Sequence, residues 1–292
     1  MFVENINSAR YEYFPVDVPE NMIHALPAGV YTARITSTGE LHLVPTAVTK
    51  DLIVDLDTPT AMHVKREVTD FFDQEITSRL AAAQLKHRRG IILHGEAGTG
   101  KTSLVRAIFP QLIEQNAVIL LDPDVSSLVR QIIPAIRRTD ANRPIVIVFD
   151  EFHYVVDRSA TYLLQLLDGL TSPDHIITIG TTNYMARIPK TICARPSRFS
   201  LVLEVPHLPE SARHVYAQTK YPSLDVNLTA ELVTITISMA LDFLEEALKL
   251  AIMGYTCEDI VARFAASDLT GCAINDENDL YTEQLDDFPE YD

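Results

Sequence analysis

Residues 95–103, GEAGTGKTS, have the composition and spacing of a loop that binds phosphate. Gly95, Gly100, Lys101 and Thr102 satisfy the pattern G-x-x-x-x-G-K-[ST], in which glycines let successive backbone N–H groups point at one anion. Lys101 would reach the β- and γ-phosphates of a nucleotide, and the Thr102 hydroxyl would ligate Mg²⁺. The alternative is a plain turn between a strand and a helix. The predicted nucleotide-binding residues are those of the whole loop: Gly95, Glu96, Ala97, Gly98, Thr99, Gly100, Lys101, Thr102 and Ser103.

Two adjacent carboxylates, Asp150 and Glu151, follow the apolar run PIVIVF. After a buried strand in a protein with a phosphate loop, Asp150 is expected to hold Mg²⁺ through its water shell. Glu151 is expected to act on the attacking water as a general base or as a group that orients it. This pair therefore favours hydrolysis over transfer of phosphate to a bound acceptor.

Three further polar residues complete the predicted catalytic set. Asn183 ends the apolar run IITIGTT, where its amide could bind both the attacking water and a phosphate oxygen; a helix cap or turn is the alternative. Arg195 and Arg198, in RPSRF, could supply positive charge to the γ-phosphate held by a neighbouring subunit. The alternative for these two is that one simply pairs with a carboxylate. The predicted catalytic residues are Lys101, Glu151, Asn183, Arg195 and Arg198.

The elements that must position these residues read as an α/β fold. Five apolar runs (GIILHG, AVILLD, PIVIVFD, HIITIGTTN and SLVLEV) alternate with helical patterns, which predicts a doubly wound, five-stranded parallel sheet over residues 59–206. Residues 1–58 predict a small β-rich module, since VYTARITSTGELHLVP has the alternation of a hairpin. Residues 207–265 are predicted to be helical, and residues 266–292 to be an acidic, disordered tail.

Charge and composition limit the function classes. The formal net charge is -16, and no Lys or Arg follows Arg263. This acidity argues against a non-specific grip on nucleic-acid phosphates. The most apolar long window, residues 235–253, carries Asp242, Glu245, Glu246 and Lys249, so no membrane span is expected. Three cysteines without metal-ligand spacing and without a secretory signal favour a reducing, cytoplasmic compartment.

In this order and spacing, the motifs resemble those of the AAA family of ATPases, within the wider AAA+ class, over roughly residues 60–265. GEAGTGKT is similar to its Walker A loop, IVIVFDE to its Walker B strand, TTN to its sensor 1 and RPSRF to its paired arginine fingers. The resemblance implies a ring, usually a hexamer, that binds ATP with Mg²⁺ between neighbouring subunits. Residues 207–265 would then be the small lid domain.

Several positions depart from the family pattern. Glu96-Ala97 stands where the family often has Pro-Pro, and the segment from Asn183 to Arg195 is one residue longer. The segment SMALDFLEEALKL contains no sensor 2 arginine. Residues 122–144 contain no aromatic residue and no glycine, whereas protein-unfolding members carry an aromatic pore loop there.

The resemblance implies an ATPase that remodels a protein or protein complex. This protein substrate would bind to the N-terminal module or in the pore of the ring. The alternative is a nucleic-acid-linked motor or loader, with Arg130, Arg137 and Arg138 lining the pore. Two further possibilities are a scaffold that hydrolyses ATP slowly, against which Glu151 weighs, and a small-molecule kinase.

The acidic tail is interpreted as solubilising or, alternatively, as a docking peptide. His153, beside Glu151, packs against the site or tunes it.

Overall fold

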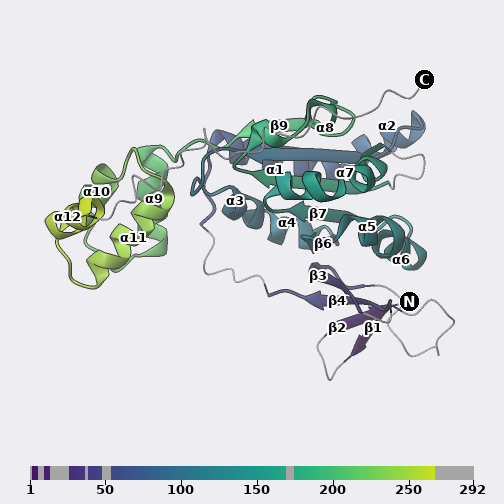
Figure 1. Cartoon of the computed structure of the whole chain (residues 1–292), viewed down its shortest axis with the longest axis horizontal. Coiled ribbons are helices and arrows are strands. Elements are labelled where there is room, and N and C mark those ends of the chain that lie inside the picture. Colours follow the sequence, from purple (N-terminus) through teal and green to yellow (C-terminus); the bar gives the residue numbers. More distant parts are fainter. Residues whose placement is uncertain are drawn as a thin grey trace, which may run out of the picture.

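Nine strands form one sheet in the part of the chain that the structure describes, in the order β1-β2-β4-β3-β6-β7-β8-β5-β9 (Figure 1). The computed structural model describes residues 2–5, 10–13, 26–36, 39–47, 54–168 and 174–266. The five predicted strands are confirmed, and all pair in parallel. They are β5 (Arg88–His94), β6 (Val118–Leu121), β7 (Ile145–Phe149), β8 (Ile176–Thr182) and β9 (Leu201–Glu204).

The predicted count of five strands is wrong for the whole sheet, because the N-terminal strands continue it. These are β1 (Phe2–Asn5), β2 (Arg10–Tyr13), β3 (Gly29–Ile35) and β4 (Leu41–Pro45). The predicted hairpin is confirmed as the antiparallel pair β3–β4. Strand β3 also pairs in parallel with β6, from Gly29 opposite Val118 to Thr32 opposite Leu121. An edge strand exposes unpaired N–H and C=O groups, and this pairing satisfies them on β6.

Helices cover both faces of the sheet, which explains why the central strands are continuously apolar. On β7, Ile145, Ile147 and Phe149 belong to one core, and Val146 and Val148 belong to the core on the opposite face. One face is covered by α1 (Pro59–Phe72), α3 (Lys101–Ala107) and α4 (Phe109–Glu114). The other is covered by α5 (Val125–Ser127), the π-helix η2 (Leu128–Ile132), α6 (Ile133–Thr139), α7 (Phe152–Asp168) and α8 (Lys190–Cys193).

The start of α1 follows from its sequence. The Thr58 side chain accepts a hydrogen bond from the Ala61 N–H at 3.2 Å, and Pro59 occupies the first turn. A hydroxyl cap followed by proline is a strong start signal for a helix. Helix α2 (Gln74–Ala82) follows, and the 3-10 helix η3 (Met185–Arg187) comes after β8.

The C-terminal helices form a separate lobe with its own core (Figure 1). They are α9 (Glu210–Lys220), α10 (Val226–Ile235), α11 (Leu241–Ile252) and α12 (Cys257–Ala266). Arg213 is fully buried in this lobe and donates to the carbonyl oxygens of Leu208 at 3.0 Å and Thr236 at 2.9 Å. The helical prediction for this region is therefore confirmed. The predicted acidic tail lies outside the described residues from 267 onward.

None of the helices in these described ranges is both long enough and apolar enough to span a membrane.

Candidate nucleotide-binding site

The glycine-rich loop connects β5 to α3 and takes a conformation that its glycines make possible. Gly95 and Gly98 have φ values of +149° and +72°, which side chains rarely adopt. Space is also restricted, because a Cβ on Gly95 would lie 2.5 Å from the Val205 carbonyl oxygen. A Cβ on Gly98 would lie 2.8 Å from a carboxylate oxygen of Asp242 on α11. The loop is therefore enclosed by the residue after β9 on one side and by the helical lobe on the other.

Lys101 lies inside this loop, and only 7% of it is exposed. Its Nζ donates to the carbonyl oxygens of Gly95 at 2.9 Å and Glu96 at 2.6 Å, and lies 3.4 Å from Thr99 Oγ1. Burial lowers the pKa of Lys101, while the nearby carboxylates, Glu151 first, act in the opposite direction. A buried ammonium group surrounded by oxygen atoms is well placed to bind phosphate oxygens.

The structure brings the two predicted magnesium-binding residues together. Thr102 Oγ1 lies 3.2 Å from both carboxylate oxygens of Asp150, to which it donates. Thr181 also donates its hydroxyl to Asp150. A hydroxyl beside a carboxylate supplies the hard oxygen ligands that Mg²⁺ prefers, so these residues fit that ion. In the described ranges, no group of three or more His, Cys, Asp or Glu side chains could hold a metal.

Asp122 is a site residue that the sequence analysis missed. It follows β6, and its Oδ1 accepts a hydrogen bond from the Asp150 N–H at 2.7 Å. Burial raises the pKa of Asp122, and the hydrogen bond from Asp150 opposes that shift. An acidic residue directly after an apolar strand was the available signal, but many turns begin in the same way.

Glu151 and Asn183 are also in contact. Asn183 Nδ2 donates to Glu151 Oε1 at 3.0 Å, which links the ends of β7 and β8. Glu151 has a φ of +48°, an uncommon value for a residue with a side chain. This conformation lets the chain leave β7 and enter α7 within two residues, so the carboxylate stays at the end of the sheet.

The two arginines differ in how deeply they are buried. Arg198 is 9% exposed; it pairs with Asp168 and donates to the Thr191 carbonyl oxygen. The side chain of Arg195 is 60% exposed, and its Nη1 lies 3.9 Å from Asp168 Oδ2. The alternative stated above, that one of the two arginines pairs with a carboxylate of its own chain, therefore describes Arg198. The role in trans remains a prediction for both residues.

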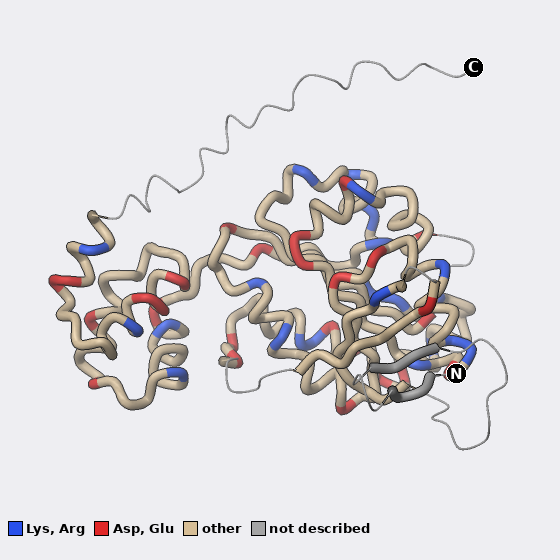
Figure 2. Tube along the Cα trace, turned by 60° about the horizontal axis from the view of Figure 1, so that its bottom comes forward, with Lys and Arg blue, Asp and Glu red and all other residues tan. Residues whose placement is uncertain are grey.

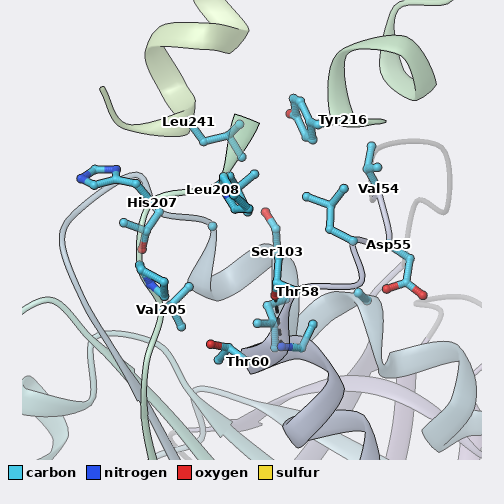
Figure 3. Close-up of a pocket in the computed structure, with 18 of the residues that line it drawn as sticks. Val54, Asp55, Thr58, Thr60, Ser103, Val205, His207, Leu208, Tyr216 and Leu241 are labelled. Atoms are coloured by element: carbon cyan, nitrogen blue, oxygen red, sulfur yellow. Dashed lines mark hydrogen bonds between the residues drawn. The ribbon is translucent and has the colours of Figure 1, made fainter. Parts of the chain in front are cut away.

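A pocket beside the loop combines Thr99, Gly100 and Ser103 of the predicted loop with residues for which the sequence carried no specific signal. Figure 3 shows side chains converging from the segment before α1, from helix α3, from the connection between β9 and α9, and from the helical lobe. Most are apolar or small, as suits a flat heterocycle beside the phosphate loop. Those labelled include Val54, Thr58, Ser103, Val205, His207, Leu208, Tyr216 and Leu241. The amide of Leu241 donates to the Gly98 carbonyl oxygen at 2.9 Å, which joins the lobe directly to the loop.

The arginines proposed to line a pore are engaged within their own chain. Arg137 donates to the carbonyl oxygens of Arg143 and Asp174. Arg130 Nη2 donates to the Tyr162 hydroxyl at 2.6 Å. Acidic and basic residues are interspersed along the described trace in Figure 2. The Arg137 guanidinium, bound to carbonyl oxygens, is therefore not presented to phosphates, whereas Arg130 and Arg138 lie on the exposed surface.

Comparison with known proteins agrees with this geometry. Residues 91–207 match the model of the ATPase family associated with various cellular activities (AAA). A vesicle-fusing ATPase from Caenorhabditis elegans is 28% identical over 179 residues, which are 50% of this chain and 22% of that protein. The peroxisomal ATPase PEX6 from Eremothecium gossypii is 32% identical over 163 residues, 48% of this chain and 16% of the relative. A cell division cycle protein 48 homolog from Archaeoglobus fulgidus is 27% identical over 188 residues, 57% of this chain and 26% of the relative.

This chain thus matches about a quarter or less of the length of each of these relatives. The matched part includes the phosphate loop, the two carboxylates, Asn183 and both arginines. Residues 91–207 therefore carry an AAA ATPase domain, and this part of the chain is similar to relatives that are named as ATPases or as a cell division cycle protein.

Proposed function

We propose that this chain binds ATP with Mg²⁺ and hydrolyses it as one subunit of a ring, a hexamer by analogy with the family, to remodel a protein or protein complex. The observation that carries the proposal is the contact between Glu151 and Asn183 beside Lys101 and Thr102. The contact holds a carboxylate and an amide at the ends of adjacent strands. That is the arrangement needed to orient a water molecule toward a terminal phosphate.

Each residue of the site has a defined task in this proposal. Lys101 binds phosphate oxygens in place of the carbonyl oxygens that its ammonium group now contacts. Thr102 and Asp150 hold the magnesium ion, which would neutralise charge on the phosphates. Glu151 orients the attacking water and accepts its proton, and Asn183 fixes the carboxylate in position.

Arg195 is the residue that we assign to the neighbouring subunit's site. Its exposed guanidinium group can reach a partner, whereas Arg198 is buried against Asp168. An arginine supplied in trans stabilises charge that develops on the transferred phosphoryl group. This assignment makes hydrolysis depend on assembly.

The kind of work is inferred from the relatives, which are named for vesicle fusion, peroxisomes and the cell division cycle. Remodelling of a protein or protein complex suits all three names. We propose the division made from the sequence: an N-terminal module (1–58), a large ATPase subdomain (59–206), a helical lid (207–265) and an acidic tail (266–292). The substrate would be engaged through the module or the pore, in the cytoplasm.

The test is steady-state ATP hydrolysis measured over a range of protein concentrations. Wild type should gain specific activity cooperatively with concentration, and Glu151→Gln and Arg195→Ala should lose it at every concentration. Arg66→Ala is the matched control, because this α1 side chain is 81% exposed and should not matter. Mixing Arg195→Ala with Lys101→Ala subunits should restore part of the activity, since some interfaces then combine an intact loop with an intact arginine. Activity independent of concentration and of Arg195 would contradict the ring mechanism.

A further inference from the structure

His153 is a fully buried polar side chain next to the proposed catalytic carboxylate. It lies in the first turn of α7, two residues after Glu151, and none of its surface is exposed. Its Nδ1 lies 3.1 Å from Thr182 Oγ1 and 3.4 Å from Glu151 Oε2. The rings of Tyr154 and Tyr184 pack against the imidazole, with centroids 4.1 Å and 5.0 Å away. One nitrogen of this ring therefore lies between the carboxylate and the end of β8.

The surroundings of the ring select one tautomer. Nε2 is buried and has no hydrogen-bond partner. A buried N–H donor without an acceptor is costly, so the proton belongs on Nδ1, where two oxygen atoms are within reach. Thr182 Oγ1 already accepts from the Tyr184 N–H at 3.0 Å. The Nδ1–H group is thus placed to be shared between the threonine hydroxyl and Glu151.

The carboxylate of Glu151 has one oxygen with a hydrogen-bond donor and one without. Its Oε1 accepts from Asn183, while its Oε2 is buried without a hydrogen-bond donor and faces His153 Nδ1. Burial lowers the pKa of His153; Glu151 opposes the shift, Arg187 adds to it and Asp157 opposes it. A neutral ring can donate to the carboxylate without neutralising it by an ion pair, so Glu151 keeps its capacity to accept a proton.

We infer that His153 is a positioning residue for ATP hydrolysis, which holds the second oxygen of Glu151 while Asn183 holds the first. The inference rests on the proposed role of Glu151. Held at both oxygens, the carboxylate has one orientation toward the attacking water. Removing the Nδ1 donor frees the carboxylate to rotate, which slows the chemical step and leaves ATP binding intact.

The test compares His153→Phe with His153→Asn. Phenylalanine keeps a ring between the two tyrosines and removes the donor, whereas the asparagine Nδ2 can stand near the position of Nδ1. We expect His153→Phe to lower kcat about 10-fold or more, with KM for ATP and the Kd of a fluorescent ATP analogue within about 2-fold of wild type. We expect His153→Asn to recover kcat to within about 3-fold of wild type. Should the phenyl ring prevent folding, as judged by thermal melting, His153→Leu replaces it.

A double-mutant cycle separates this role from simple packing. In a Glu151→Gln background, His153→Phe should change the residual rate by less than about 2-fold, because its effect acts through the carboxylate. Unchanged kcat in both His153→Phe and His153→Leu would overturn the inference, as would equal losses in the phenylalanine and asparagine variants. If Glu151→Gln itself hydrolyses ATP at the wild-type rate, the proposed function fails. If only the His153 variants are wild-type-like, this inference alone fails.

Discussion

Asp122 holds the backbone of Asp150: its Oδ1 accepts the Asp150 N–H at 2.7 Å, which joins the end of β6 to the end of β7. The two strands are neighbours in the sheet, so this bond continues their ladder with a side chain. The carboxylate proposed to hold magnesium is thereby fixed through its own backbone. Positioning of this kind acts on activity more than on nucleotide binding.

Replacing Asp122 should therefore slow hydrolysis. Asp122→Ala leaves the Asp150 N–H without its acceptor and should lower kcat about 10-fold, while Asp122→Asn keeps an acceptor oxygen and should lose less than about 3-fold. Steady-state kinetics at saturating Mg-ATP checks this. Asp124→Asn, two residues further on, is the control and should leave kcat unchanged. Equal rates for the alanine variant and wild type would rule out this role for Asp122.

Gly98 should be sensitive to a single added methyl group because of space as well as conformation. Gly98→Ala places a Cβ 2.8 Å from Asp242 Oδ2, which should push α11 away from the loop and raise the Kd for ATP about 10-fold or more. Gly39→Ala is the matched control: it also has positive φ, at +85°, but nothing lies within 4 Å of its Cβ position. It should lose about 1 kcal/mol of folding stability and no affinity. Equal losses of affinity in both variants would contradict the proposed clash.

The two arginines should give opposite results in stability and activity measurements. Arg198→Ala leaves Asp168 without its buried partner and should lower the free energy of unfolding by about 2 kcal/mol, less than for a fully buried pair because Asp168 is about one-third exposed. Arg195→Ala should change stability by less than about 0.5 kcal/mol and still abolish concentration-dependent hydrolysis. Urea unfolding followed by circular dichroism, beside the ATPase assay, distinguishes them. A stable Arg198→Ala protein without activity would move the trans role to Arg198.

His87 should make stability depend on pH. It is 3% exposed and stacks on Phe71 with ring centroids 4.1 Å apart. Burial lowers its pKa from the usual 6.5, and the neighbouring His175 adds to this. His87 therefore takes up a proton more readily in the unfolded chain than in the native state. The free energy of unfolding should consequently fall as the pH drops below about 6.5.

The measurement for His87 is the free energy of unfolding at pH 7.5 and pH 5.5. His87→Phe should lose less stability than wild type between these two values, because the replacement ring does not take up a proton. His63→Gln, on the exposed side of α1, should keep the wild-type slope. A slope in His87→Phe equal to that of wild type would assign the pH dependence to other groups.

Much of the central fold could be predicted because its signals are local. Continuous β-branched runs mark strands covered on both faces, and the Thr58-Pro59 pair marks the start of α1. The positions of the candidate site residues were also predictable, because each follows directly from a strand end: Gly95 after β5, Asp150 after β7 and Asn183 after β8. In a parallel sheet these ends lie at one edge, so contacts between them follow from the strand order.

The remaining features depend on contacts between distant segments. The alternation in residues 29–45 predicted a hairpin, but its pairing with β6 joins residues almost ninety positions apart and has no local pattern. Arg195 and Arg198 are of one type, three positions apart, and only the packing against Asp168 distinguishes them. Similarly, the pocket beside the loop combines Val54, Ser103 and Leu241, which no motif connects.

The parallel pairing of β3 with β6 has a mechanical consequence. Thr32 lies opposite Leu121, the residue before Asp122, and Asp122 in turn holds Asp150. A force applied to the N-terminal hairpin would act on the row of backbone hydrogen bonds between β3 and β6 instead of extending a flexible linker. The hairpin and this edge of the sheet are therefore joined by continuous backbone pairing, and any displacement that the hairpin transmits would begin next to the residues proposed to hold magnesium.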